Sequence, residues 1–481
     1  MVITLRLSYG IVAIFALACI GSAMAAPPSF RLLWNFSQEG VGVESAPSVA
    51  DLTGDSHLDV VFAIWEEGST WVIAVNGLTG KEIWRYGPTT GTTGMLIDDI
   101  NGDSLLEVVF VAFTGKTGEI IALNGPLGGL LWKYDGNYRK THLLDRPACA
   151  DINGDGRKEV IFAPRDASGR NTTAFDGISG EIVWESAAVG AGIAGGGQLN
   201  YKAPACIADI EGDGNLEVIT NHIGFAWIVD ARTGLLKYEL QGAGIADGAF
   251  VVHDVNGDGL KEMIVMGAYN ISCYHPDTSQ MVGDAVWLWD YDGGRTGYNN
   301  VVGADFDGDG KLEVINVEQG GDPEGPGYGF VQCRNAEDGT MIWNFSTLGK
   351  FVNLAPAVGD LDGDDHPDLL MGCEAPEGGF AYAIKGNTGE TLWNQTMNSR
   401  TENCGCIADV DGNGKIDVII GDQDQMLCFE TSTDVPFGYV AWAMPNHDPW
   451  NSAIFPMPEA VILELSGLFL AGIVAVKVRR K

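Results

Sequence analysis

The sequence predicts an all-β protein, an eight-bladed β-propeller with four strands in each blade, built from residues 30–444. Three observations predict this fold. A short acidic loop, for example DINGDGRKE, occurs eight times at similar intervals, starting at Asp51, Asp99, Asp151, Asp209, Asp254, Asp305, Asp360 and Asp409. A glycine followed shortly by an aromatic residue comes after most of these loops. Alternating runs of apolar and β-branched residues, separated by glycine turns, lie between them, as expected for strands. Repeats of this kind are typical of propeller blades.

Each repeat contains four predicted strands, which the third repeat shows in order. The first, 147–152 (PACADI), ends just past the first acid of the loop, and the second, 159–163 (EVIFA), starts at the last acid. The third, 172–177 (TTAFDG), leads to a glycine turn, and the fourth, 181–186 (EIVWES), carries the aromatic residue. The acidic loop therefore joins the first and second strands of each blade. A β-solenoid or a string of small domains is the alternative fold, and no useful helical period appears before position 458.

The aromatic residue of the fourth strand keeps a nearly constant distance from its acidic loop. In six repeats its separation from the first aspartate is identical, at Trp84, Trp132, Trp184, Trp287, Trp393 and Trp442. Trp343 comes later in its repeat because the segment 320–329, GGDPEGPGYG, is inserted between the second and third strands. Tyr238 comes slightly earlier in the fourth repeat.

The closure of the ring has two possible solutions in the sequence. The segment 30–37, FRLLWNFS, mirrors 340–346, TMIWNFS, so Trp34 fits the outermost strand of a blade. Trp442 fits the same place in blade eight. We favour closure by the N-terminal strand, with residues 438–443 lying beside it.

Each acidic loop has the composition of a site for a hard cation. In residues 254–262, DVNGDGLKE, carboxylate or amide side chains occupy alternate positions, and two glycines allow a tight turn. Calcium takes about six to eight oxygen ligands, which these side chains and a backbone carbonyl near Leu260 would supply. The loop is not an EF-hand, because its closing acid is the ninth residue and a strand follows. A polar hairpin turn is the alternative for any single loop, and the eightfold repetition favours up to eight calcium sites.

The predicted metal ligands occupy the first, third, fifth and ninth loop positions. In chain order they are Asp51, Asp55, Asp59, Asp99, Asn101, Asp103, Glu107, Asp151, Asn153, Asp155, Glu159, Asp209, Glu211, Asp213, Glu217, Asp254, Asn256, Asp258, Glu262, Asp305, Asp307, Asp309, Glu313, Asp360, Asp362, Asp364, Asp368, Asp409, Asp411, Asn413 and Asp417.

These loops resemble FG-GAP or VCBS repeats, the calcium-binding blades of integrin α-subunit propellers and of many prokaryotic surface proteins. The glycine-to-tryptophan feature, as in DGISGEIVW, is similar to the tryptophan-docking repeats of quinoprotein propellers. Both resemblances cover roughly positions 30–443 and imply metal positions without implying a reaction. The sequence departs from the usual pattern at Thr53, Ser56, Ser104 and Asp365, so we expect weaker calcium binding in blades one, two and seven.

Composition and the chain ends predict a location outside the cytoplasm. The net charge of -36, from 28 basic and 64 acidic residues, argues against a nucleic acid partner. Residues 1–25 have the basic start, apolar run and small-residue cleavage site of a signal peptide, and a lipoprotein signal ending at Cys19 is the alternative. The eight remaining cysteines show no disulfide framework. Five Asn-x-Ser/Thr sequons, at Asn35, Asn171, Asn270, Asn344 and Asn394, would allow a glycoprotein.

The C-terminal end combines a Pro-rich spacer, 445–458, with an apolar segment and a basic tail, 459–481. The apolar run, 460–476, is short for a membrane-spanning helix and contains Glu464, so it is a marginal membrane anchor if helical. The arrangement resembles the PEP-CTERM or PEF-CTERM sorting signals of prokaryotic surface proteins. Both interpretations predict a chain at the cell surface or envelope of a prokaryote, attached to the membrane through this segment.

No serine–histidine–aspartate grouping, zinc pattern or phosphate loop stands out in the sequence. We therefore expect a non-catalytic binding or adhesion module for a glycan or protein. The alternatives are a polysaccharide-acting enzyme similar to rhamnogalacturonan lyases, a structural surface-layer component and a PQQ-dependent dehydrogenase. The ligand face is predicted where the chain enters each innermost strand, opposite the acidic loops. Its candidate residues are His142, Arg146, Tyr201, Lys202, Tyr298, Asn299, Asn300, Asn353, Arg400 and Asn403.

Overall fold

The computed structural model describes most of the predicted propeller. The described ranges are 28–115, 117–139, 146–163, 172–186, 205–222, 225–241, 250–266, 270–275, 282–284, 286–292, 301–319, 329–347, 356–375, 378–401, 404–434, 462–464 and 477–479. Within these ranges the regular elements are all strands.

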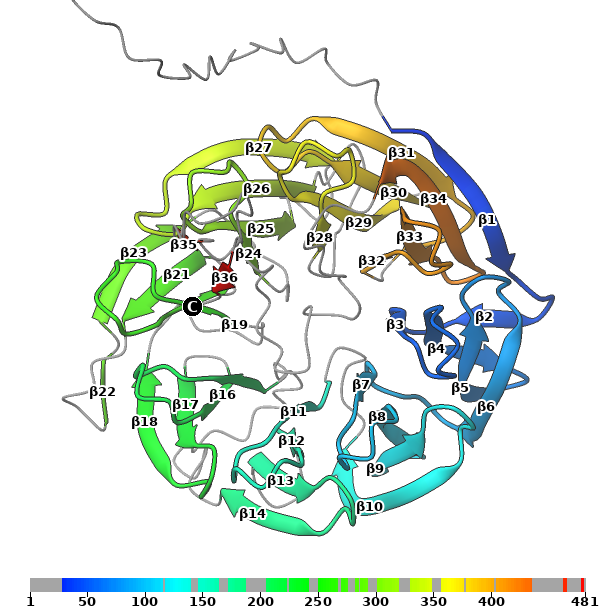
Figure 1. Ribbon diagram of the computed structural model, residues 1–481, viewed down its shortest axis with the longest axis horizontal. Coiled ribbons are helices and arrows are strands. Elements are labelled where there is room, and N and C mark those ends of the chain that lie inside the picture. Colours follow the sequence, from blue (N-terminus) through cyan, green and yellow to red (C-terminus); the bar gives the residue numbers. More distant parts are fainter. Residues whose placement is uncertain are drawn as a thin grey trace, which may run out of the picture.

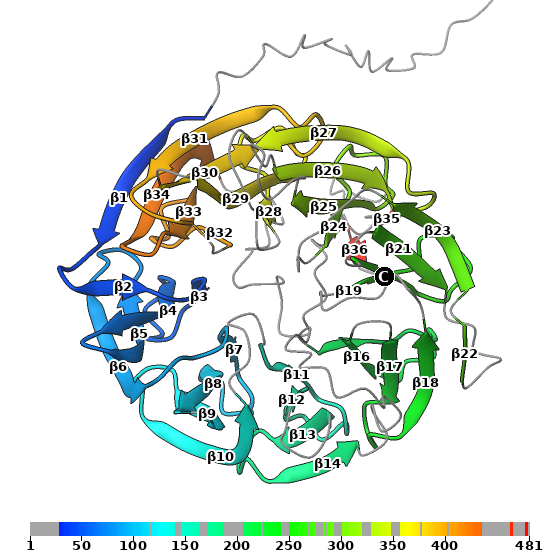
Figure 2. The ribbon, with the colours of Figure 1, turned by 180° about the vertical axis from the view of Figure 1, so that it is seen from behind.

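Eight antiparallel blades surround a central axis (Figures 1 and 2), which confirms the predicted fold. Blade one comprises β2 (Val41–Val43), β3 (Ser48–Ala50), β4 (Asp59–Glu66), β5 (Ser69–Asn76) and β6 (Glu82–Thr89). Blade two comprises β7 (Leu96–Asp98), β8 (Glu107–Thr114), β9 (Thr117–Asn124) and β10 (Leu130–Arg139). Blade three comprises β11 (Ala148–Ala150), β12 (Glu159–Phe162), β13 (Thr172–Asp176) and β14 (Ile182–Ser186). Blades four and five comprise β15 (Cys206–Ala208), β16 (Glu217–His222), β17 (Phe225–Asp230) and β18 (Leu236–Gln241); and β19 (Phe250–His253), β20 (Glu262–Met266), β21 (Asn270–His275) and β23 (Val286–Asp292). Blade six comprises β24 (Val302–Ala304), β25 (Glu313–Gln319), β26 (Gly329–Asn335) and β27 (Met341–Thr347). Blade seven comprises β28 (Ala357–Gly359), β29 (Asp368–Ala375), β30 (Gly378–Ile384) and β31 (Thr391–Met397). Blade eight comprises β32 (Cys406–Ala408), β33 (Lys415–Gly421), β34 (Met426–Asp434) and β1 (Phe30–Phe36).

Two blades carry a short strand beyond the predicted four. In blade one, β2 and β3 both pair with β4, one with each half of that strand. In blade four, β22 (Val282–Asp284) pairs in parallel with the outermost strand β18.

The N-terminal strand closes the ring, as predicted. β1 pairs antiparallel with β34, so the last blade takes its outermost strand from the start of the chain (Figure 1). Arg31 Nη2 lies 2.8 Å from Glu430 Oε1, and the ring of Phe30 stacks on Trp393 of blade seven with centroids 4.4 Å apart. Trp442, the competing residue, lies outside the described residues.

The repeated glycine and tryptophan join neighbouring blades. Trp132 Nε1 of blade two donates to the Gly177 carbonyl of blade three over 2.8 Å. Gly180 of the same turn has φ +68°, and a Cβ there would lie 2.5 Å from the Trp132 ring, so only glycine fits this contact. The indoles of Trp34, Trp84, Trp184 and Trp343 dock on the following blade in the same way, at Gly77, Gly125, Ala231 and Gly386. Trp34 thus does for blade eight what the other tryptophans do for their own blades.

The register of blade five differs from the sequence prediction. Trp289 pairs with Cys273, the register position that Trp84 and Trp132 hold opposite Ala74 and Ala122. The predicted residue, Trp287, is two positions earlier. The extra strand β22 lies in the connection between β21 and β23, so a fixed count from the loop misses the change.

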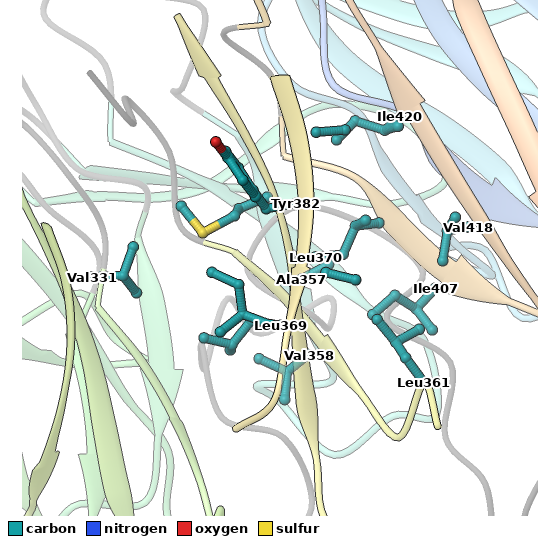
Figure 3. Packing of buried hydrophobic residues seen from close by; sticks show 14 of the residues in the cluster. Val331, Ala357, Val358, Leu361, Leu369, Leu370, Tyr382, Ile407, Val418 and Ile420 are labelled. Carbon is teal, nitrogen blue, oxygen red and sulfur yellow. The ribbon is translucent and has the colours of Figure 1, made fainter. Parts of the chain in front are cut away.

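The core is a set of apolar layers between adjacent blades. The largest cluster spans blades six, seven and eight and includes Val331, Leu369, Tyr382 and Ile407 (Figure 3). Side chains of the second and third strands fill these layers because neighbouring blades pack face to face, with every second residue pointing into each interface.

The described part of the C-terminal tail is a strand pair, where the sequence suggested an apolar helix. β35 (Ile462–Glu464) pairs antiparallel with β36 (Lys477–Arg479). The β-branched residues Ile462 and Val478 are compatible with strands. Among the described residues, no helix is long and apolar enough to cross a membrane.

Candidate metal centres in the acidic loops

The eight acidic loops form a ring on one face of the propeller. Each loop joins the innermost strand of its blade to the second strand, as predicted, so the rotation that relates the blades places all loops on the same side. Several neighbouring loops are hydrogen-bonded: the amides of Leu58, Lys158 and Lys261 donate to the carbonyls of Val410, Ile100 and Ile210 in the preceding blade. The fold of one loop therefore supports the next.

The first aspartate folds each loop around itself. In blade three, Asp151 Oδ1 accepts bonds from the amides of Gly154 and Asp155 at 2.7 and 3.1 Å, and Oδ2 accepts from Gly156 at 2.9 Å. Most of the same bonds recur in the other loops, for example at Asp51, Asp254 and Asp360. The repeated aspartate is therefore required for loop structure as well as being a predicted ligand.

The substitutions in blades one, two and seven do not alter the loop backbone. The sixth loop residue has positive φ in every blade, and it is glycine in five of them. Ser56, Ser104 and Asp365 take this conformation at φ 70°, 69° and 67°. The backbone conformation alone therefore gives no reason for these loops to bind a metal differently.

The ninth residue of every loop is a buried carboxylic acid. The members, all 0 or 1% exposed, are Asp59, Glu107, Glu159, Glu217, Glu262, Glu313, Asp368 and Asp417. In seven loops one carboxylate oxygen accepts a bond from the amide of the second loop residue, as in Glu313 Oε2 to Phe306 N at 2.8 Å. Burial raises the pKa of Glu107, Glu159, Glu313 and Asp417 to about 7. Eight buried acids in one ring are costly unless cations or protons offset their charge.

Blades six, seven and eight bring three carboxylates together. Ligand oxygens within each group lie within 4.8 Å of one another, in Asp305–Asp307–Glu313, Asp360–Asp362–Asp368 and Asp409–Asp411–Asp417. Each group also contains a buried oxygen that has no hydrogen-bond partner within the described part of the chain: Glu313 Oε1, Asp362 Oδ1 and Asp417 Oδ1. Oxygen-only donors with unsatisfied lone pairs fit a hard cation such as calcium.

In blades one to three, the hydrogen-bond partners of the ninth acid differ from blade to blade. Asn101 and Asn153 donate from Nδ2 to Glu107 Oε1 and Glu159 Oε1 at 3.0 and 2.7 Å. In blade one, Thr53 donates to Asp59 Oδ2, and Asp59 Oδ1 has no partner.

Blade five adds a histidine that the sequence analysis did not select. His275 Nδ1 lies 2.6 Å from Glu262 Oε1, and its Nε2 lies 3.7 Å from Asp258 Oδ2, so a nitrogen joins the two acids in this group. His275 ends the third strand, so a search confined to the loop cannot find it. The pairing of the strands could have pointed to His275. Glu262 starts β20, which pairs with β19 on one side, where His253 is opposite Glu262, and with β21 on the other, where His275 is the last residue.

Lysines enter two of the loops. In blade four, Lys237 Nζ lies 2.7 Å from both Glu211 Oε2 and Glu217 Oε1. In blade seven, Lys385 Nζ lies 2.5 Å from Asp362 Oδ2 and 2.9 Å from Asp364 Oδ2. These are also contacts that the sequence analysis missed, because each lysine lies far along the chain from the acids that it contacts.

Only two of the ten predicted ligand-face residues fall in the described residues. Arg146 is 1% exposed and lies against Gly94, and its assignment to the ligand face stays a prediction. It lies just before β11, where the chain enters the interior. Arg400 is exposed, and its Nη2 lies 2.6 Å from Glu374 Oε2. The other eight, His142, Tyr201, Lys202, Tyr298, Asn299, Asn300, Asn353 and Asn403, and most of the inserted segment 320–329 lie outside the described residues.

The eight described cysteines are all buried, and none of them forms a disulfide, in agreement with a packing role. Burial raises the pKa of the thiols of Cys149, Cys273 and Cys333. Such thiols are poor nucleophiles.

Comparison with known proteins supports the fold alone. No protein-family profile matches the chain, and no curated protein matches its sequence. Among solved structures, BamB from Moraxella catarrhalis has a TM-score of 0.50 at 14% identity, over 83% of this chain and 97% of BamB. Quinohemoprotein alcohol dehydrogenase from Comamonas testosteroni has a TM-score of 0.55 at 15% identity, over 91% of this chain and 78% of the enzyme. The exotype rhamnogalacturonan lyase YesX also has 0.55 at 15% identity, over 85% and 76%. The chain is thus an eight-bladed β-propeller, and the structures similar to it include proteins of quite different activities.

Proposed function

We propose that this chain is an exported, cell-surface binding module whose propeller is stabilised by calcium in the acidic loops. In this proposal the face opposite the loops binds a glycan or a protein. The observation that carries the calcium assignment is the buried, unpartnered carboxylate oxygen beside two further acids in blades six, seven and eight. A divalent cation would satisfy these oxygens and offset the charge of the cluster.

The role assigned to calcium is structural. The loops are repeated around the whole ring, and several are hydrogen-bonded to their neighbours, so an ion in one loop stabilises the contact with the next. An ion that binds only the folded state adds about 2.7 kcal/mol per site at a hundredfold excess over its Kd.

The test compares the unfolding temperature and the calcium content of two variants. We expect EGTA to lower the unfolding midpoint of the wild-type protein by several degrees. Glu313→Gln keeps the shape of the side chain but removes its charge, and it should lower the bound calcium by one ion per chain. Glu337→Gln, at an exposed acid paired with Lys311 near the same loop, is the matched control and should leave the calcium content unchanged. An EGTA-insensitive midpoint would remove calcium from the proposal.

The topology of the blades supports the proposed ligand face. The innermost strands begin on the face opposite the acidic loops, and the sequence that precedes them contains aromatic, amide and charged residues that the repeat does not require. A glycan array tests the ligand class. For a ligand found there, Tyr298→Ala with Asn300→Ala should weaken binding, whereas Lys311→Ala, in the loop ring, should not. The reverse pattern would move the binding site to the loop face, and a blank array would favour an architectural role.

A further inference from the structure

We propose that the ammonium group of Lys237 takes the place of a calcium ion in the acidic loop of blade four. This inference rests on the proposed calcium sites, because it states which acidic loop departs from them. Blade four keeps all four acids of the pattern, Asp209, Glu211, Asp213 and Glu217, so its sequence predicts one of the most complete sites. The contacts in the folded blade lead to a different result.

Three residues of blade four differ from their counterparts in the other blades, and they meet in space. Glu211 holds the third loop position, where the other loops have threonine, asparagine or aspartate. Lys237 precedes the aromatic residue, where the neighbouring blades have apolar residues such as Leu131 and Val183. Tyr238 replaces the docking tryptophan. Their joint occurrence in one blade indicates a single local arrangement.

That arrangement uses every oxygen of the two glutamates. Lys237 Nζ donates to Glu211 Oε2 and Glu217 Oε1, each at 2.7 Å. The Tyr238 hydroxyl donates to Glu211 Oε1. The Ile210 amide donates to Glu217 Oε2 at 2.9 Å. A calcium ion in this loop would have to break or weaken at least one of these bonds to gain a carboxylate oxygen.

The electrostatics favour the lysine over an added ion. Glu217 is fully buried, and Lys237 is about a quarter exposed, so their pair lies in a region of low dielectric where a hydrogen-bonded ion pair is stronger. A lysine ammonium is charged at neutral pH and would repel a divalent cation at the same carboxylates.

Blades six and seven show what a loop without this arrangement looks like. In blade six, Glu313 Oε1 has no partner and faces two aspartates, so a place for a cation remains. In blade seven, Lys385 contacts Oδ2 of Asp362 and Asp364, while Asp362 Oδ1 stays unpartnered in the cluster with Asp360 and Asp368. A lysine near the loop is thus not sufficient. The decisive feature in blade four is that the lysine binds the buried ninth acid itself.

The test counts calcium ions bound per full-length chain, by equilibrium dialysis followed by elemental analysis. Lys237→Met removes the ammonium, keeps most of the side-chain volume and should raise the count by one. Lys133→Met, which breaks an ion pair with Glu119 in blade two, is the matched control and should leave the count unchanged. Glu211→Gln in the wild-type background should also leave it unchanged, whereas Asp307→Ala, which removes the ligand oxygen at the same position of blade six, should lower it by one.

The outcomes separate this inference from the proposed function. A loss of one bound calcium ion in Glu211→Gln, or an unchanged calcium count in folded Lys237→Met, would overturn the role proposed for Lys237 while leaving calcium in the other loops. A wild-type chain that binds no calcium would overturn both. Since Lys237→Met leaves two acids unpaired without metal, its unfolding midpoint should fall in EGTA and recover in calcium by more than the wild-type midpoint does. Equal recovery in the two proteins would also count against the inference.

Discussion

At the scale of single residues, the first and ninth acids of a loop have separate tasks. Asp151 accepts three backbone amides and so fixes the turn, and its side chain stays partly exposed. Glu159 is buried and holds the loop to the second strand through the Ile152 amide. Replacing the first acid should therefore disturb loop structure even without metal, whereas an amide at the ninth position should mainly affect the ion.

Gly180 provides a test of the contact between blades. Gly180→Ala forces a residue with a side chain into a left-handed conformation, which costs roughly 1–2 kcal/mol, and it also places a Cβ against the Trp132 ring, which adds about 1–3 kcal/mol. Gly68 has a similar φ of +82° but nothing within 4 Å of an added Cβ. Gly68→Ala should therefore show the backbone cost alone in urea unfolding. Equal losses of stability would show that the tryptophan contact is loose.

At the scale of elements, β1 closes the ring with two very different faces. Trp34 is 7% exposed and docks on blade one through the Gly77 carbonyl, whereas Leu32 is 49% exposed. Trp34→Ala should cost about 3–5 kcal/mol of unfolding free energy because it removes a buried aromatic residue at the ring closure. Leu32→Ala should change it by at most about 0.5 kcal/mol, as is usual at the surface. Urea unfolding checks both, and similar effects would mean that β1 contributes little to closure.

Much of the fold is predictable because its signals are local in the sequence. These signals are the acidic loop, the strand on each side of it and the glycine before Trp132, and eight copies support one another. The match between 30–37 and 340–346 even favours the closing strand. The tryptophan of blade five is different, because the position of Trp289 rather than Trp287 depends on the connection that contains β22 and on how β21 and β23 pair.

The candidate sites were predictable only as far as each loop is self-contained. Acids within a single loop could be selected, and three clusters in the structure contain three of them. His275 and Lys237 could not, since they reach the loops from other strands of the blade. Two acidic loops with equally good sequences can therefore differ in charge balance once the sheet is formed.

At the scale of the whole molecule, charge is distributed very unevenly. The chain has a net charge of -36, and 27 acids belong to the loop positions on one face. Without metal, these acids repel one another across neighbouring loops, several of which are in hydrogen-bonding contact. This repulsion opposes ring closure, and calcium bound in the loops would relieve it.

The ionic-strength dependence of stability tests this account of the whole ring. Salt screens charge over a Debye length of about 10 Å at 0.1 M, so sodium chloride should raise the unfolding midpoint strongly in EGTA, when the loop acids are uncompensated. In saturating calcium the same salt series should have a much smaller effect, because the charge is already offset. Sucrose stabilises folded proteins without screening charge and should shift both midpoints alike. Parallel salt slopes in EGTA and in calcium would show that repulsion among the loop acids does not limit the stability of the propeller.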